Sequence, residues 1–65
     1  MEKPTNFRKG LVIWPRGFEN IERVTEDRGR ATIHYVNGTS DSFPTRLSAE
    51  EISDHLWEEK NKKYV

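Results

Sequence analysis

The chain has 65 residues, no cysteine, and 11 basic side chains balanced by 11 acidic ones. A domain of this length buries only about 60% of the surface of its unfolded chain, which argues against a large internal active-site cavity. The absence of cysteine excludes disulfides, cysteine-type zinc sites and thiol catalysis, and we expect a cytoplasmic protein. Because the net charge is zero, no overall positive field would attract nucleic acid.

The N-terminal part of the chain predicts one strand. Residues 1–6 are polar, include Pro4 and show no periodic pattern, so we predict a flexible N-terminus there. The apolar run 11–14, between Gly10 and Pro15, predicts a short, buried strand. This longest apolar run is far shorter than the roughly 20 residues that span a bilayer, so we expect neither a membrane segment nor a secretion signal.

The next segment carries Ile21 and Val24 at a spacing of three, which fits a helix as well as a strand. We favour a strand because the turn residues Arg28-Gly29 follow and would form an antiparallel hairpin with the segment after them. In a two-residue loop Val24 faces Ile33. The same register places Ile21 opposite Val36. A three-residue loop would shift the pairing by one and exchange the faces, so both registers stay open.

The clearest hairpin signal is Asn37-Gly38, which follows a β-favouring stretch over residues 31–36. Both turn residues tolerate positive φ, so we predict a two-residue type I′ turn. This turn would pair His34 with Asp41. Pro44 cannot donate to a central ladder, so the chain is predicted to leave the sheet there.

The C-terminal part of the chain predicts a helix over about residues 49–60. Ser48 followed by Glu51 fits a capping box, which marks a helix start. An apolar stripe on this helix should cover one face of the sheet, with Trp57 on its flank. The stripe consists of Ala49, Ile52 and Leu56.

Together these patterns predict one α+β domain over residues 7–60, in which a small antiparallel sheet of three or four strands, a meander, is packed by one C-terminal helix. Residues 61–65 are predicted to be a basic tail. The order strand, Asn-Gly turn, strand, helix is seen in many small bacterial and phage proteins. The short, cysteine-free chain is similar to small phage-encoded regulators of host proteins.

Two constellations could carry chemistry. A His34–Asp41 pair could act as a general base, or could be an ordinary charge pair on a hairpin, and no nucleophile accompanies it. Glu51, His55 and Glu59 share a helical face and could bind a metal, but a second histidine is missing and i,i+4 pairing explains the spacing. We therefore expect no catalysis, no metal and no cofactor.

The leading functional hypothesis is protein–protein contact, in which the chain regulates or inhibits a larger protein. Arginine and tryptophan are enriched in binding hot spots, and a basic and aromatic cluster surrounds the loop after the first strand. The alternative for its aromatic rings, and for Trp57 on the helix, is a place in the core. The predicted partner-binding residues are Arg8, Lys9, Trp14, Arg16, Phe18 and Trp57.

Two other expectations concern partners. An arginine-rich sheet face could instead bind nucleic acid, in which case affinity would fall steeply with salt. Its residues would be Arg8, Lys9, Arg16, Arg23, Arg28 and Arg30. Because a domain this small has a thin core, association with a second copy is also expected.

Overall fold

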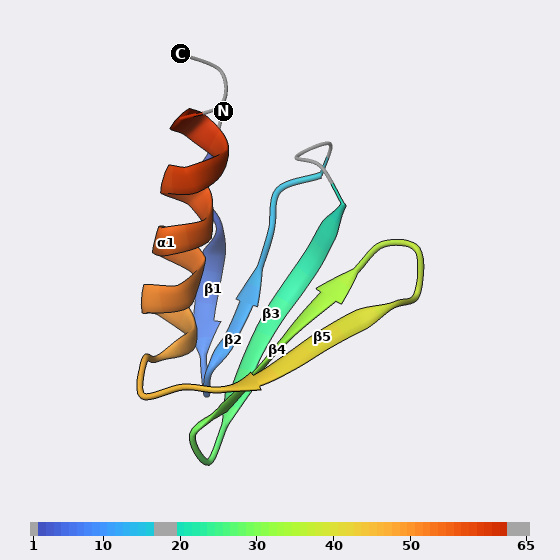
Figure 1. Ribbon diagram of the computed structural model, residues 1–65. Helices are drawn as coiled ribbons and strands as arrows, with labels where there is room; N and C mark the ends of the chain where they lie inside the picture. Colours follow the sequence, from blue (N-terminus) through green and yellow to red (C-terminus); the bar gives the residue numbers. More distant parts are fainter. Residues whose placement is uncertain (1, 17–19, 63–65) are drawn as a thin grey trace.

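The computed structural model describes residues 2–16 and 20–62. In this part of the chain, five strands precede one helix. Each strand pairs antiparallel with the next, so the sheet is a meander with β1 and β5 at its two edges (Figure 1). The elements are β1 (Thr5–Arg8), β2 (Leu11–Ile13), β3 (Ile21–Asp27), β4 (Arg30–Tyr35), β5 (Ser40–Pro44) and α1 (Ala49–Lys62).

The α+β class, the antiparallel meander and the C-terminal helix are confirmed, but the sheet has five strands rather than three or four. The additional strand is β1, which pairs with β2 through a two-residue loop at Lys9-Gly10. Both loop residues have positive φ, 49° and 76°, as a type I′ turn requires. Lysine has no preference for this conformation, so a turn was predicted at Gly10 but a hairpin was not. Consequently Thr5 and Asn6 belong to a strand instead of a flexible terminus, and Pro4 is buried.

The β3–β4 hairpin has the two-residue loop, with Arg28 at φ 51° and Gly29 at φ 78°. Val24 therefore pairs with Ile33, as one of the two predicted registers requires. The predicted pairing of Ile21 with Val36 is wrong. Ile21 pairs with Tyr35, because the register shifts between Ile21 and Arg23. Such a bulge keeps Ile21 on the buried side of the sheet, where it is 5% exposed.

The β4–β5 hairpin corrects a second prediction, because its loop has three residues, 36–38, rather than two. The Tyr35 backbone N–H donates to the Thr39 carbonyl over 2.9 Å, and the Gly38 N–H donates to the Tyr35 carbonyl over 3.1 Å. Gly38 takes a left-handed φ of 92°, as a three-residue hairpin loop favours. All pairs after the turn are therefore shifted by one, and Phe43 faces Ala31 on the helix side of the sheet.

The chain leaves the sheet after Pro44, which is the last residue of β5. Pro44 pairs with Arg30, and β5 is an edge strand, so its missing N–H leaves no ladder bond unmade. The predicted departure at Pro44 is therefore confirmed to within one residue, and Pro44 itself still pairs because an edge strand accepts a proline.

The helix begins as predicted. The Glu51 N–H donates to Ser48 Oγ over 3.2 Å, and the Ser48 N–H donates to Glu51 Oε1 over 3.2 Å, which completes the capping box. Its end lies at Lys62, two residues beyond the predicted one, so the first part of the predicted tail is helical. Residues 63–65 of that tail lie outside the described residues.

The core lies between α1 and the face of the sheet that it covers, where the helix packs on β2 and β3. We call this face of the sheet the inner face. Tyr35, Phe43, Leu56 and Trp57 are half-buried and pack against the core. The buried apolar residues are Val12, Trp14, Ile21, Val24, Ala31, Ile33, Ala49 and Ile52.

Candidate functional site

The second face of the sheet, which we call the outer face, is an open surface of the described chain. Since Val12, Val24 and Ile33 are cross-strand partners that point into the core, their strand neighbours point the other way. No described element covers these side chains. The outer face consists of Thr5, Arg8, Leu11, Ile13, Arg23, Thr25, Asp27, Arg30, Thr32, His34, Ser40, Ser42 and Pro44.

The strand register arranges this face in rows that cross the sheet. One row crosses all five strands from Thr5 through Ile13, Arg23 and His34 to Ser40. A second row, one pleat further along, runs from Arg8 through Leu11, Thr25 and Thr32 to Ser42. A third, shorter row consists of Asp27, Arg30 and Pro44.

Two hydrogen bonds hold side chains of the outer face in place. Thr25 Oγ1 lies 3.1 Å from His34 Nε2, which joins β3 to β4. Arg30 Nε donates to Ser42 Oγ over 2.7 Å, which joins β4 to β5. The bond to Ser42 uses only one of the five N–H donors of the Arg30 guanidinium, so most of these N–H groups still face solvent.

Charge on the outer face is predominantly positive. Arg8, Arg23 and Arg30 come from three different strands, and Asp27 is the carboxylate that shares the face with them. Arg23 also forms an ion pair with Glu22, its neighbour at the bulge, over 2.5 Å. Lys9 and Arg28, in the two type I′ turns, are exposed at the end of the sheet next to Arg8 and Arg30.

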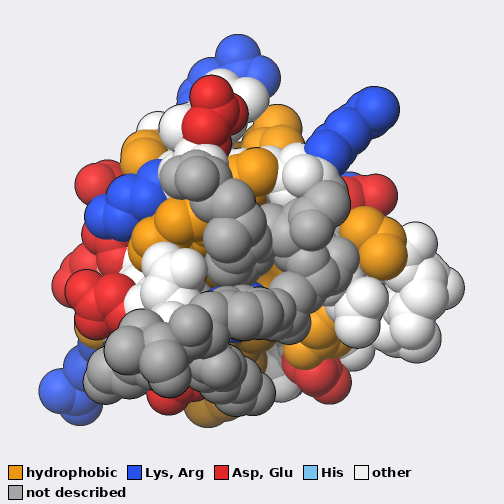
Figure 2. All heavy atoms as spheres, turned by 90° about the horizontal axis from the view of Figure 1, so that it is seen from above, with side chains coloured by type: hydrophobic (Ala, Val, Ile, Leu, Met, Phe, Trp, Pro, Cys, Tyr) orange, Lys and Arg blue, Asp and Glu red, His pale blue; other side chains and the backbone are white. Residues whose placement is uncertain are grey.

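The helix, on the other side of the sheet, carries five of the eleven acidic side chains. Figure 2 shows Asp and Glu side chains gathered on the side where α1 lies, at the left of the view. In α1 the acidic residues outnumber the two lysines. These acidic residues are Glu50, Glu51, Asp54, Glu58 and Glu59. The protein is thus neutral overall but has a basic sheet face and an acidic helix.

Two aliphatic side chains, Leu11 and Ile13, give the outer face an apolar part on β2. Leu11 is half-buried, and Ile13 is 43% exposed. The predicted buried strand is therefore buried on one side only: Val12 and Trp14 enter the core, while their alternate neighbours face outward. Arginines and hydroxyl groups flank this apolar part.

The basic residues of the predicted site do not form one cluster. Arg8 and Lys9 are exposed at the end of the sheet where β1 turns into β2, whereas Arg16 follows the opposite end of β2. The extended chain between Lys9 and Arg16 spans roughly 20 Å. Arg8 belongs to the outer face and Arg16 does not, so the two could not be expected to contact one partner group together.

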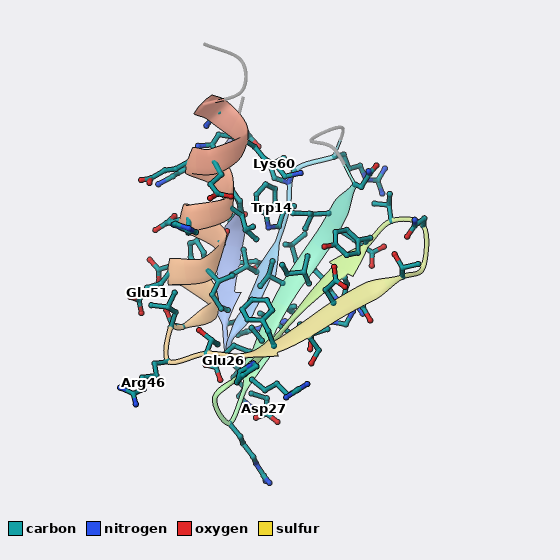
Figure 3. All side chains as sticks on the ribbon, viewed as in Figure 1. Trp14, Glu26, Asp27, Arg46, Glu51 and Lys60 are labelled. Atoms are coloured by element: carbon teal, nitrogen blue, oxygen red, sulfur yellow. The ribbon has the colours of Figure 1, made fainter. Side chains whose placement is uncertain are left out.

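The aromatic residues of the predicted site belong mainly to the core. Trp14 is 4% exposed, which makes it unsuitable as a contact residue and supports the alternative of a core position. Trp57 is half-buried, and its ring packs on that of Trp14 with centroids 6.2 Å apart. Figure 3 shows Trp14 and Lys60 close together at one end of the layer between helix and sheet. Phe18 lies outside the described residues.

The predicted His34–Asp41 pair does not form. His34 pairs with Ser40 on the outer face, whereas Asp41 pairs with Ile33 on the inner face, because the three-residue loop shifts the register by one. Asp41 instead accepts a hydrogen bond of 2.8 Å from the Tyr35 hydroxyl. This bond raises the pKa of Tyr35 above 10.0, and burial and the Asp41 charge act in the same direction. The arrangement contains no histidine held by a carboxylate on the sheet.

On the helix, Glu51 is engaged in the capping box, and His55 Nε2 lies 3.7 Å from Glu59 Oε1. These contacts are those of a helix cap and an i,i+4 pair. Within residues 2–16 and 20–62, no three His, Cys, Asp or Glu side chains are placed to hold a metal ion together.

A depression of about 350 Å³ lies at the end of the sheet where β2 ends and β3 begins. Its polar side chains are one arginine and one glutamate, and apolar residues form the rest. The lining of this depression differs from the lining of a small-molecule site, where several polar groups converge on the ligand. The lining residues are Ile13, Trp14, Pro15, Arg16, Ile21, Glu22 and Val36.

Comparison with protein-family models, curated proteins and solved structures found no match to this chain. In the part of the chain that the structure describes, no helix has the length and apolar character needed to cross a membrane. The assignment of the candidate site therefore rests on the geometry of the structure alone.

Sequence reasoning missed the contribution of Thr25, Thr32 and Ser42 to the outer face. Which residues share a face depends on loop lengths and bulges, and local sequence does not determine these.

Proposed function

We propose that this chain is a non-catalytic protein-binding domain whose outer face docks on an acidic surface of its partner. The observation that carries this proposal is the placement of Arg8, Arg23 and Arg30 on one uncovered sheet face, with Asp27 as its carboxylate. Basic and acidic groups that face each other steer two proteins together and set their orientation. A role as a regulator or inhibitor of a larger protein follows from such binding.

The chemistry of the face suits a protein partner. Arginine forms bidentate bonds with carboxylates and is enriched at binding hot spots. Leu11 and Ile13 supply apolar area at the centre of such a contact, while Thr25, Thr32 and Ser42 can hydrogen-bond to the partner's backbone or side chains. The face thus combines an apolar part with a polar, basic rim.

Nucleic-acid binding is the second candidate, because the same three arginines are side chains of the kind that contact phosphates. Two observations favour a protein instead. The outer face, as the strand register defines it, contains no phenylalanine, tyrosine or tryptophan ring on which an unpaired base could stack, and its imidazole, that of His34, is half-buried and hydrogen-bonded to Thr25. The net charge of the chain is zero, whereas nucleic-acid-binding domains are usually basic.

A site-specific photocrosslinker would test the proposal. We would place it at Thr32 of β4, in the second row of the outer face, and at the exposed Glu58 of α1 as a matched control, and irradiate each variant in cell lysate. The expected result is a discrete protein adduct from the Thr32 position that survives nuclease treatment and is absent from the Glu58 position. Charge reversal by Arg23→Glu with Arg30→Glu should abolish it.

Other outcomes decide against the proposal. A nuclease-sensitive adduct from Thr32 would favour the nucleic-acid candidate, and its yield should fall steeply between about 50 and 200 mM salt. Equal adducts from Thr32 and Glu58, or an adduct unaffected by the double charge reversal, would show that the outer face is not the binding surface. Circular dichroism of each variant establishes that the fold is retained.

A further inference from the structure

The edge strand β5 presents unpaired backbone groups to solvent. The Tyr35 N–H donates to the Thr39 carbonyl and the Thr45 N–H donates to the Gly29 carbonyl, so every second residue from 39 to 45 directs its backbone toward β4. The intervening residues Ser40, Ser42 and Pro44 direct theirs away from the sheet. No described strand pairs with that side of β5.

This edge is more regular than the other edge of the sheet. The β4–β5 pairing has no register shift from Arg30 to His34, whereas the β1–β2 pairing shifts, and Asn6 in β1 takes a φ of 74°. Natural sheets protect their edges with bulges, prolines or charged side chains. In β5 the one charged side chain, Asp41, is hydrogen-bonded by Tyr35 on the inner face, and Pro44 stands at the strand end.

We propose that two copies of this chain pair through β5, antiparallel about a two-fold axis at Ser42, so that their sheets become continuous. The Ser42 backbone N–H then donates to the Ser42 carbonyl of the second copy, and the Ser42 carbonyl accepts from the Ser42 N–H of that copy. On either side, the Ser40 N–H donates to the Pro44 carbonyl of the other copy. Pro44 lacks an N–H, but in this register it needs only its carbonyl for that bond.

Side-chain chemistry selects this register. A two-fold axis at Asp41 would allow as many backbone bonds, but it would place the two Asp41 carboxylates directly opposite each other, which is unfavourable. With the axis at Ser42, Asp41 faces Phe43 of the second copy on the inner face, and the two Ser42 hydroxyls meet on the outer face. Arg30 already donates to Ser42 there, so the outer faces of both copies would join into one basic surface.

The pairing also offsets a weakness of the isolated chain. A 65-residue domain buries a small share of its surface, and Phe43 is only half-buried at the edge of the core. Adding a strand beside β5 would cover Phe43 further. An isologous contact of this kind closes after two copies, so it gives a dimer and not a filament.

Single-cysteine variants test the register directly, because the natural chain has no cysteine. In the proposed dimer the Ser42 Cα atoms are about 5.5 Å apart, within the range of a disulfide. The Ser40 Cα atoms are about 14 Å apart, because four residues separate them along the strands. Mild oxidation should therefore cross-link Ser42→Cys at least about fivefold more than Ser40→Cys, a matched exposed serine on the same face. Thr5→Cys, on edge strand β1, serves as the control for random collisions.

Sedimentation equilibrium of the unmodified chain provides the second measurement. We expect a concentration-dependent mass that rises from 7.7 kDa toward twice that value. A strict monomer up to millimolar concentration would overturn the proposal, and so would equal cross-linking of the Ser40→Cys and Ser42→Cys variants. Preferential cross-linking between the Ser40→Cys and Ser42→Cys variants in a mixture of the two would replace the proposed register with the alternative one, in which residue 40 lies opposite residue 42 of the other copy. These outcomes are independent of whether the outer face binds another protein.

Discussion

Trp14, just after β2, and Trp57 of α1 pack against each other with ring centroids 6.2 Å apart and ring planes inclined by 51°. This tilted contact joins the helix to the sheet at one end of the core. Aromatic pairs in such geometries contribute about 0.5–1.5 kcal/mol beyond the apolar area that they bury. In a chain of 65 residues, this contact is a substantial part of the total stability.

We expect Trp14→Ala to lower the free energy of unfolding by about 3–5 kcal/mol, because it empties a buried site. A domain of this length has a total stability of about 3–10 kcal/mol, so the variant should lose a large share of its stability. Urea denaturation of Trp14→Leu, Trp57→Leu and the double variant, which remove one or both rings, would measure the coupling between the rings. Additive effects of the two single substitutions would show that the ring contact carries no energy of its own.

Gly10 should be the least replaceable of the three turn glycines that the structure describes. A Cβ atom at Gly10 would lie 2.5 Å from the Glu26 carbonyl oxygen, a backbone atom that cannot move aside, and φ is 76°. Gly38 also has positive φ, at 92°, but a Cβ there would meet nothing within 4 Å. We expect Gly38→Ala to cost about 1 kcal/mol from backbone strain alone and Gly10→Ala to cost clearly more. Thermal unfolding of the two variants checks the order, and equal losses would contradict it.

Two serines near the same helix should respond oppositely to alanine. Ser53 is 0% exposed, and its hydroxyl has no hydrogen-bond partner among the described residues, so Ser53→Ala should stabilise the fold by about 1 kcal/mol. Ser48 caps the helix, so Ser48→Ala should destabilise it by about 1 kcal/mol. Denaturant midpoints of both variants give the comparison. A loss of stability in Ser53→Ala would mean that the buried hydroxyl makes a favourable interaction.

The Tyr35–Asp41 hydrogen bond should be visible in a tyrosine titration. Because Asp41 raises the pKa of Tyr35 above 10.0, the protonated phenol is favoured in the folded state. Its stabilising contribution is therefore complete below pH 10 and is lost as the pH rises through the higher, folded-state pKa. In a Tyr64→Phe background, ultraviolet absorbance should give a midpoint above 10, and Asp41→Asn should lower it. An unchanged midpoint in the Asp41→Asn variant would contradict the bond.

Local sequence determined the elements whose signals lie within a few residues. The Ser48 and Glu51 side chains complete a capping box with each other's backbone, so the helix start could be predicted without knowledge of the sheet. The Arg28-Gly29 loop is a second local feature. Both of its residues have positive φ, and its glycine favours such a two-residue turn. These interactions connect residues that are already close along the chain.

Tertiary packing decided the strand register, and with it the candidate site. A two-residue turn at Asn37-Gly38 would have placed Phe43 on the outer face, whereas the three-residue loop places it opposite Ala31 against the core. Full burial of a phenylalanine contributes about 1.5–3 kcal/mol, so the half-buried Phe43 still contributes on the order of 1 kcal/mol in favour of this register. Because a shift of one residue exchanges the faces of a strand, this burial also separated His34 from Asp41 and placed Ser42 on the outer face.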